Sequence, residues 1–139
     1  MARVAHCQCG ALRASAGGEP DAVVACSCTA CQRRTGSVFG VGAYFARSRV
    51  TFEGAAREYE RKADSGRTVR SFFCPVCGTS LYWLAERDPE RVGIAVGAFA
   101  DAAFPAPDRS VFDSRKHAWV EFGAAMPGFV HGRDSARSR

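Results

Sequence analysis

Seven cysteines, gathered in three groups, constrain this 139-residue chain more than any other feature of its sequence. The groups are Cys7 and Cys9 in "HCQCG", Cys26, Cys28 and Cys31 in "CSCTAC", and Cys74 and Cys77 in "FFCPVCG". Spacings of two or three residues are typical of thiolate metal ligands rather than of cysteines that only pack in a core. The odd number also excludes a complete disulfide framework. The fold must therefore bring distant segments together around bound metal.

The three groups divide into four sulfurs and three. In "CPVCG" a tight turn directs two sulfurs to one point, and Gly78 relieves crowding of the backbone. The first pair of cysteines is also followed by a glycine, Gly10. These two pairs supply the four sulfurs of a closed structural zinc site, whereas the middle group leaves one coordination position unfilled. We therefore expect two zinc ions per chain, one structural and one in an open site.

A histidine is the alternative occupant of that fourth position. The chain has three histidines, His6, His117 and His131. His6 lies beside the first pair of cysteines and His131 lies next to the C-terminal segment, so His117 is the main candidate. A Cys₃His set is a common structural site and would be chemically inert. The sequence leaves an open and a closed middle site both possible.

The arrangement of apolar residues predicts mostly β-structure, because short apolar segments bounded by Gly or Pro are typical of strands. "DSG" predicts a hairpin turn between two of them. From residue 101 to 113 Pro and Asp predict a long loop, and only one helical turn is expected, after Cys31. The expected strands span residues 11–16, 22–25, 40–46, 57–63, 67–73, 80–85 and 91–99. We expect a single all-β domain over residues 1–132 and a basic, disordered tail over residues 133–139.

Composition and charge exclude several classes of protein. With 47% apolar and 24% charged residues, the chain resembles folded soluble proteins, and no apolar run reaches the roughly 18 residues of a membrane helix. The N-terminus "MARVAHCQCG" lacks the pattern of a secretory signal, so we expect a cytoplasmic protein with reduced thiols. The net charge of +5 includes +2 from the tail, and seven thiolates on two zinc ions would lower it by three. A nucleic-acid partner is therefore not expected.

Four segments, "HCQCGAL", "CSCTACQRRTGS", "FFCPVCGTSLYW" and "KHAW…MPGF", together resemble a known family. This is the glutathione-dependent formaldehyde-activating enzyme family, which also contains the centromere protein V domain, and the resemblance runs from about His6 to Phe129. It implies a zinc-stabilised β-tent fold of small antiparallel sheets. It further implies a structural zinc on Cys7, Cys9, Cys74 and Cys77, and a catalytic zinc on Cys26, Cys28 and Cys31.

The activity that the resemblance implies is the condensation of glutathione with formaldehyde, classed as a carbon–sulfur lyase for the reverse direction. Three thiolates on zinc leave room for a small-molecule thiol, which is then held as the nucleophilic thiolate. Ser110 and His117 depart from the family pattern, and these departures bear on which substrate is bound and not on the metal sites. Arg33 and Arg34 are candidates for binding a substrate carboxylate, with a solvated basic pair as the alternative. The competing function is a non-catalytic zinc module for a protein or nucleic-acid partner.

Overall fold

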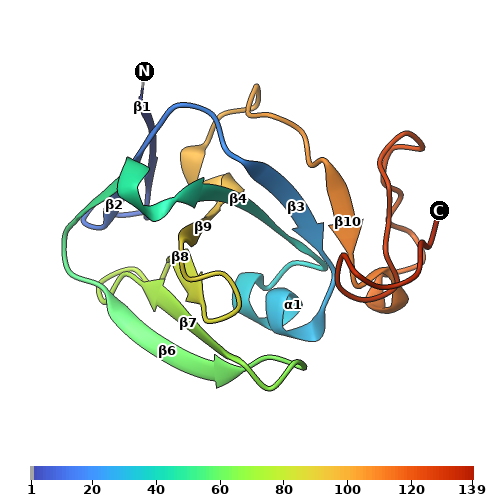
Figure 1. The fold of residues 1–139 in the computed structure, drawn as a ribbon. Helices are drawn as coiled ribbons and strands as arrows, with labels where there is room; N and C mark the ends of the chain where they lie inside the picture. Colours follow the sequence, from blue (N-terminus) through green and yellow to red (C-terminus); the bar gives the residue numbers. More distant parts are fainter. Residues whose placement is uncertain (1) are drawn as a thin grey trace. The chain divides into compact units, whose positions relative to one another are not determined.

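The structure, a computed structural model, describes residues 2–139 (Figure 1). These residues form ten β-strands, one α-helix and three short 3-10 helices, so the all-β prediction is confirmed. Two compact units make up the chain. The first runs up to Asp21 and continues over Ala43–Phe104, and the second comprises Ala22–Gly42 and Pro105–Arg139. None of the helices in residues 2–139 combines the length and the apolar character that spanning a bilayer requires.

The first unit begins with a three-stranded antiparallel sheet. Its strands, in the order β1-β2-β5, are β1 (Ala2–His6), β2 (Arg13–Gly17) and β5 (Val50–Glu53). Ala5 and Ala14 lie opposite each other on β1 and β2, and both are fully buried. Sequence analysis predicts only the middle strand of this sheet. The outer two are short and carry one buried residue each, so they lack the alternation that marks a half-buried strand.

Four further strands of the first unit lie in the antiparallel order β9-β8-β7-β6. They are β6 (Arg57–Lys62), β7 (Thr68–Phe73), β8 (Ser80–Ala85) and β9 (Arg91–Ala95). The hairpin predicted around "DSG" is confirmed, because β6 pairs with β7 along its whole length. Across the turn the Ala63 amide donates to the Arg67 carbonyl at 2.8 Å, and Gly66 takes a φ of +83°.

The core of the first unit is apolar. Leu81, Val92 and Ile94 are fully buried on β8 and β9, as is Phe45 on β4 (Gly40–Ala46), the strand that enters this unit at Ala43. The 3-10 helix η1 (Arg47–Arg49) follows β4 directly. The strand predicted over residues 91–99 is too long, because the chain turns into the 3-10 helix η2 (Val96–Phe99) after Ala95.

The second unit contains two parallel strands and the α-helix. β3 (Ala22–Cys26) pairs with β10 (Arg109–Val111), so that Cys26 lies opposite Val111. α1 (Thr29–Thr35) begins three residues after β3 ends and is longer than the single turn that the sequence predicts. β10 falls within the predicted loop, and its parallel pairing is an exception to the expected antiparallel sheets. Its partner is far away in the sequence, so local periodicity does not reveal it.

Residues 133–139, expected to form a disordered tail, make defined contacts within the second unit. Arg137 pairs with Phe129 in an isolated antiparallel bridge, and the Ser138 amide donates to the Gly128 carbonyl at 2.9 Å. Arg139 forms an ion pair at 2.7 Å with Asp113, at the start of the 3-10 helix η3 (Asp113–Arg115). The Asp113 side chain is only 4% exposed, so its carboxylate requires such a partner, and sequence composition alone cannot reveal this need.

Candidate metal centres

Two loops of the first unit share a pattern of backbone hydrogen bonds. One loop carries Cys7 and Cys9, and the other carries Cys74 and Cys77. In each loop the amide of the first cysteine donates to the carbonyl five residues later, Leu12 or Thr79, at 3.0 Å. A glycine amide, from Gly10 or Gly78, then donates back to the carbonyl of that first cysteine. These glycines have φ values of +82° and +79°, which L-residues rarely adopt. The chain thus forms the same kind of turn at two places, and each turn presents two sulfurs.

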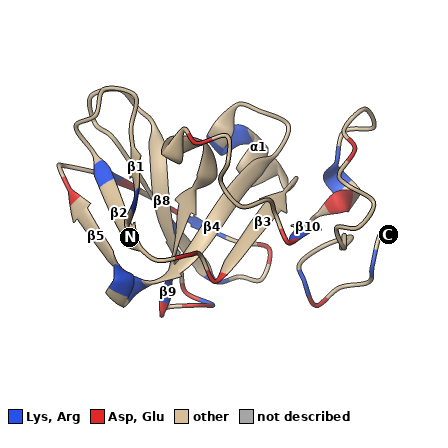
Figure 2. Ribbon diagram, turned by 90° about the horizontal axis from the view of Figure 1, so that it is seen from above, with Lys and Arg blue, Asp and Glu red and all other residues tan. Residues whose placement is uncertain are grey.

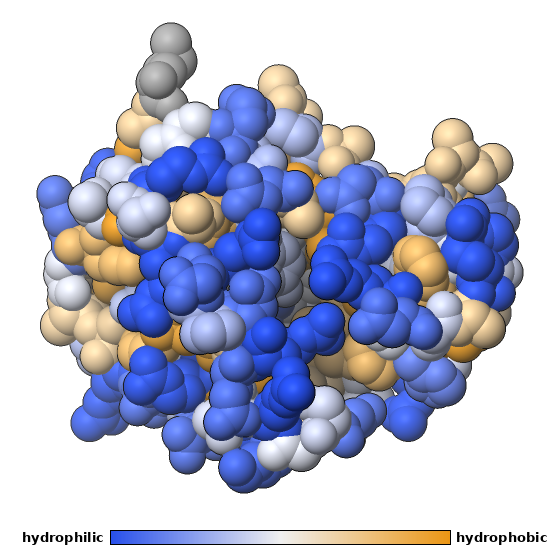
Figure 3. Space-filling model, in the orientation of Figure 1, coloured by the Kyte–Doolittle hydropathy of each residue, from blue (hydrophilic) through white to orange (hydrophobic). Residues whose placement is uncertain are grey.

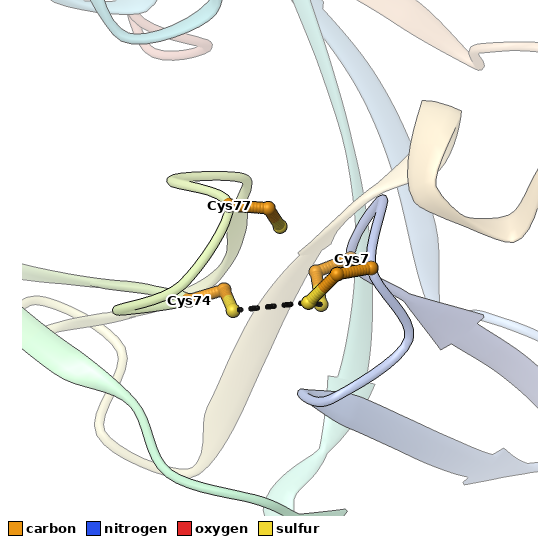
Figure 4. Close-up of side chains that lie close together, drawn as sticks. Cys7, Cys74 and Cys77 are labelled. Atoms are coloured by element: carbon orange, nitrogen blue, oxygen red, sulfur yellow. Dashed lines mark hydrogen bonds between the residues drawn. The ribbon is translucent and has the colours of Figure 1, made fainter.

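The four sulfurs of these loops lie within 4.8 Å of one another. The Sγ atoms of Cys7 and Cys9 are 3.6 Å apart, and those of Cys9 and Cys74 are 3.7 Å apart. Figure 4 shows the side chains of Cys74 and Cys77 facing that of Cys7 from the opposite loop. Zn–S bonds of about 2.3 Å in a tetrahedron would separate sulfurs by about 3.8 Å. The donor set and its spacing therefore fit a tetrahedral zinc ion.

Hydrogen-bond donors surround this four-cysteine cluster. The Leu12 amide donates to Cys7 Sγ at 3.2 Å, the Val76 amide donates to Cys74 Sγ at 3.4 Å, and Thr79 Oγ1 lies 3.3 Å from Cys77 Sγ. The hydrogen bond with Thr79, supported by backbone amides, lowers the pKa of Cys77 to about 5. For Cys9 a backbone hydrogen bond is outweighed by the neighbouring thiols and by burial, which raise its pKa to about 11. The loops thus favour thiolate at part of the cluster even before a metal adds its charge.

The position of this cluster fits a cross-linking role. Cys7 and Cys74 are fully buried, Cys77 is half-buried and Cys9 is exposed. One pair of cysteines lies in the connection between β1 and β2, and the other lies in the connection between β7 and β8. A metal held by all four would cross-link two sheets of the first unit, and four thiolates would leave no coordination position for a substrate.

The second cluster lies within the second unit and has three cysteines. Cys26 is the last residue of β3, Cys28 is the N-cap of α1, and Cys31 lies in the first turn of that helix. The Cys31 amide donates to Cys28 Sγ at 3.3 Å, so the Cys28 thiol caps the helix that carries Cys31. The three sulfurs lie within 4.8 Å of one another, which also suits a shared zinc ion.

Within the described part of the chain, the three-cysteine cluster has no fourth Cys, His, Asp or Glu ligand. Among residues 2–139, no further Cys, His, Asp or Glu places a ligand atom within 4.8 Å of all three sulfurs. His117, the main candidate from the sequence, has Nε2 3.3 Å from the Gln32 side-chain oxygen instead. His6 Nδ1 lies 2.7 Å from the Cys7 carbonyl in the first unit, and the His131 ring packs edge-on against Phe112. The geometry favours the open alternative of the two that the sequence leaves.

Mutual proximity and burial raise the pKa of two of the three cysteines, Cys26 and Cys31, which favours their protonated form in the absence of a cation. The pKa of Cys26 is raised by its hydrogen bonds with Cys28 and Cys31 and then by burial. For Cys31, the hydrogen bond with Cys26 lowers the pKa, but Cys28 and burial outweigh it, and the pKa is raised overall. From outside the cluster, the charge of Arg34 opposes this rise. A divalent cation would supply the missing positive charge, which supports a metal-binding role.

The two arginines named by sequence analysis differ in their surroundings. Both lie in the last turn of α1, where Figure 2 shows the helix coloured as basic. Arg33 is exposed, whereas Arg34 is half-buried and close enough to Cys31 to act on its charge. Arg34 packs over Gly40, where an added Cβ would lie 2.7 Å from the guanidinium Nη2 and 3.6 Å from Cys31 Cβ. The structure therefore brings Arg34 to the cluster and leaves Arg33 exposed to solvent.

Comparison with known proteins identifies the chain. A sequence profile of the glutathione-dependent formaldehyde-activating enzyme family matches residues 2–119. The chain belongs to this family. Among solved structures, the crystal structure of a Rhodobacter sphaeroides protein from a structural-genomics programme superposes with a TM-score of 0.52 at 22% identity. The match covers 68% of this chain and 85% of that one, and at this identity it supports the fold alone. No curated protein matches the chain.

Membership in the glutathione-dependent formaldehyde-activating enzyme family agrees with the resemblance found in the sequence. The matched span contains both cysteine clusters and the segment from Arg109 to Trp119. Two residues of the three-cysteine region escaped sequence analysis: Gln32, which contacts His117, and Gly40, which makes room for Arg34. The position of Gln32 directly after Cys31 was the available signal, but two of its three partners, Arg115 and His117, lie on another segment of the chain.

Proposed function

We propose that this chain is a zinc-dependent enzyme of the carbon–sulfur lyase type, which joins a small thiol such as glutathione to formaldehyde and cleaves the adduct. The supporting observation is the three-cysteine cluster of Cys26, Cys28 and Cys31, for which residues 2–139 supply no fourth protein ligand. A closed site would have no position for a substrate. The family membership supports the same reaction.

The cofactors in this proposal are two zinc ions per chain. Cys7, Cys9, Cys74 and Cys77 would hold the structural ion, and Cys26, Cys28 and Cys31 would hold the catalytic one. Zinc bound to three thiolates would lower the pKa of an incoming thiol and hold its sulfur as the thiolate. None of the seven cysteines, which all lie in the described residues, is in a disulfide, which suits the reducing cytoplasm we propose as its location.

The reaction forms one bond and moves one proton. The S–H bond of the thiol breaks, its sulfur attacks the carbonyl carbon, and a C–S bond forms while the π pair of the C=O bond moves to oxygen. The proton that leaves sulfur ends on this oxygen, which gives a hydroxymethyl thioether, and the reverse reaction releases formaldehyde. Three thiolates around one Zn²⁺ would carry a net negative charge, which opposes the binding of a further anionic sulfur. The protein therefore has to supply a compensating positive charge near the site. Arg34, beside Cys31, offsets that charge.

Charge distribution gives no support to the competing nucleic-acid function. Basic and acidic segments are intermixed along the chain (Figure 2), and the face shown in Figure 3 mixes hydrophilic residues with small apolar patches. A nucleic-acid site would need a continuous basic surface. A non-catalytic zinc module is therefore the competing outcome of the cobalt experiment.

Cobalt substitution tests the proposal. Protein loaded with Co²⁺ should change its sulfur-to-cobalt charge-transfer spectrum when glutathione binds, and zinc-loaded protein should accelerate exchange between free and glutathione-bound formaldehyde in an NMR experiment. Cys28→Ser should lose both effects, and Arg33→Gln, a change at an exposed neighbour, should retain them. A wild-type protein that binds two metal ions but shows neither effect with any small thiol would be a non-catalytic zinc module.

A further inference from the structure

The side chain of Gln32 is held at three points within the second unit. Its Nε2 donates to the Ser27 carbonyl at 2.8 Å and to the Arg115 carbonyl at 3.2 Å. Its Oε1 lies 3.3 Å from His117 Nε2. Gln32 directly follows Cys31 on α1, and Ser27 stands between Cys26 and Cys28. One side chain thus closes the loop that bears all three cysteines and ties residues 115–117 to it.

These contacts fix the hydrogen positions. Backbone carbonyls only accept hydrogen bonds, so the amide NH₂ group of Gln32 must face Ser27 and Arg115. Its oxygen therefore faces His117, and an oxygen that only accepts requires a proton on His117 Nε2. In the neutral imidazole ring the other nitrogen, Nδ1, is then the hydrogen-bond acceptor. The arrangement selects one of the two tautomers of this histidine.

His117 has an aromatic neighbour on its own segment. Its ring meets that of Trp119 edge-on, with centroids 6.1 Å apart and an interplanar angle of 86°. Trp119 is 72% exposed, unusual for so large an apolar side chain. His117 is exposed as well, so this exposed indole and the oriented imidazole present an apolar surface and a polar atom side by side, both of which a small ligand can contact.

We propose that Gln32 is a positioning residue that holds His117, and that His117 is a specificity-determining contact for the part of the thiol substrate beyond its sulfur. The proposal rests on the proposed function in that it assumes a thiol at the three-cysteine centre. Nδ1 accepts a hydrogen bond, so His117 favours peptide-like thiols with an N–H donor, such as glutathione, over thiols without one, such as 3-mercaptopropionate.

Two substitutions separate the two tasks of Gln32. Gln32→Glu keeps the acceptor toward His117 but has no N–H for the carbonyls of Ser27 and Arg115. Metal affinity of the three-cysteine centre, measured by chelator competition, should fall about tenfold, while the tautomer of His117 stays unchanged. Gln32→Lys keeps the donors but turns a donor toward His117. Its metal affinity should stay within about threefold, and the ring proton should move to Nδ1.

The tautomer is read from the ¹⁵N resonances of the His117 ring, and thiol affinity is read from the cobalt spectrum. Gln32→Lys should reduce the preference for glutathione over 3-mercaptopropionate about threefold to tenfold, the loss of one hydrogen bond. His117→Ala, which leaves Gln32 in place, should lose the same preference and retain both metal ions. A wild-type His117 protonated on Nδ1, or equal effects of both Gln32 variants on all readouts, would overturn the proposal. A wild type that binds no thiol refutes the proposed function and the specificity role of His117, while the tautomer and metal affinity still judge the positioning role of Gln32.

Discussion

The guanidinium group of Arg34 occupies the space in which a side chain on Gly40 would lie. A Cβ atom at Gly40 would approach Arg34 Nη2 to 2.7 Å, a distance at which something must move. The same position is 3.6 Å from Cys31 Cβ, so the absence of a side chain lets the arginine reach the three-cysteine cluster. The first residue of β4 thus determines which charge stands beside the cluster.

Gly40→Ala should therefore displace the flexible end of Arg34 without removing its charge. Arg34→Gln should weaken thiol binding to the cobalt-loaded protein roughly tenfold, because one partly screened charge interaction of about 1 kcal/mol or slightly more is lost. Gly40→Ala, which moves the guanidinium group but keeps its charge, should weaken binding in the same direction by a smaller factor. Arg33→Gln provides the matched control, since it removes the same charge from an exposed neighbour. Equal affinities for Arg33→Gln and Arg34→Gln would show that Arg34 has no role at the site.

Cysteine substitutions should separate the two centres by their effect on stability. Cys74→Ser should lower the melting temperature by roughly 10 °C or more, because a structural zinc ion contributes on the order of 10 kcal/mol to folding in small zinc proteins. Cys28→Ser should change the melting temperature little and lower the zinc content from two ions toward one. Differential scanning calorimetry and elemental analysis measure the two quantities. Equal melting temperatures for the two variants would refute the division into structural and open centres.

Acid should release the two metal ions in a defined order. Metal binds the deprotonated thiol, so protons compete best where the pKa is raised, as it is for Cys26 and Cys31. In the four-cysteine cluster the pKa of Cys9 is also raised, but for Cys7 hydrogen bonds outweigh burial and lower the pKa, and hydrogen bonds lower the pKa of Cys77 to about 5. Stabilisation from such a thiolate is fully present above its ordinary pKa and is lost as the pH falls through the lowered value. As pH falls, one metal ion should therefore leave while the protein stays folded.

The second ion should leave at lower pH, together with unfolding. A chromogenic chelator follows release and circular dichroism follows the fold during one titration. Simultaneous release of both ions, or unfolding with the first ion, would contradict this order.

Gly54 and Gly66 form a matched pair for backbone strain. Both have positive φ, +93° and +83°, but only at Gly54 would a Cβ overlap the carbonyl oxygen of Ala11, next to the Cys7–Gly10 loop. Gly66→Ala should cost about 1 kcal/mol in the free energy of unfolding, and Gly54→Ala about 3 kcal/mol or more. Urea denaturation of the zinc-loaded variants measures the difference. Similar losses for both would mean that the contact with Ala11 relaxes easily.

Local sequence patterns predicted the parts of this fold that local chemistry determines. The hairpin of β6 and β7 follows from alternation and a turn signal, and the cysteine groups follow from spacing. β1 and β5 were missed because each buries a single residue, and β10 was missed because its partner lies far away in the sequence. The contacts of Arg139 with Asp113 escaped for the same reason.

The candidate site shows the same limit. Residue type and spacing identify the candidate metal ligands Cys26, Cys28 and Cys31 in the sequence, whereas a glutamine or a glycine has no such recognisable pattern. Gln32 gains its role from carbonyls and a histidine that the fold brings close, and Gly40 gains its role from what it leaves vacant. Residues that act by position become recognisable only when their three-dimensional partners are known.

The two tryptophans of the chain are divided between its two units, one in each. Trp83, on β8, is half-buried and its Nε1 lies 3.3 Å from the Tyr44 hydroxyl, whereas Trp119 is largely in water. An enclosed indole fluoresces at shorter wavelength than a hydrated one, so the two emissions are separable. The blue side of the spectrum would follow the integrity of the first unit, and the red side would follow what approaches His117. The protein therefore contains its own optical reporters, and a stopped-flow instrument could time substrate arrival and unfolding without any label.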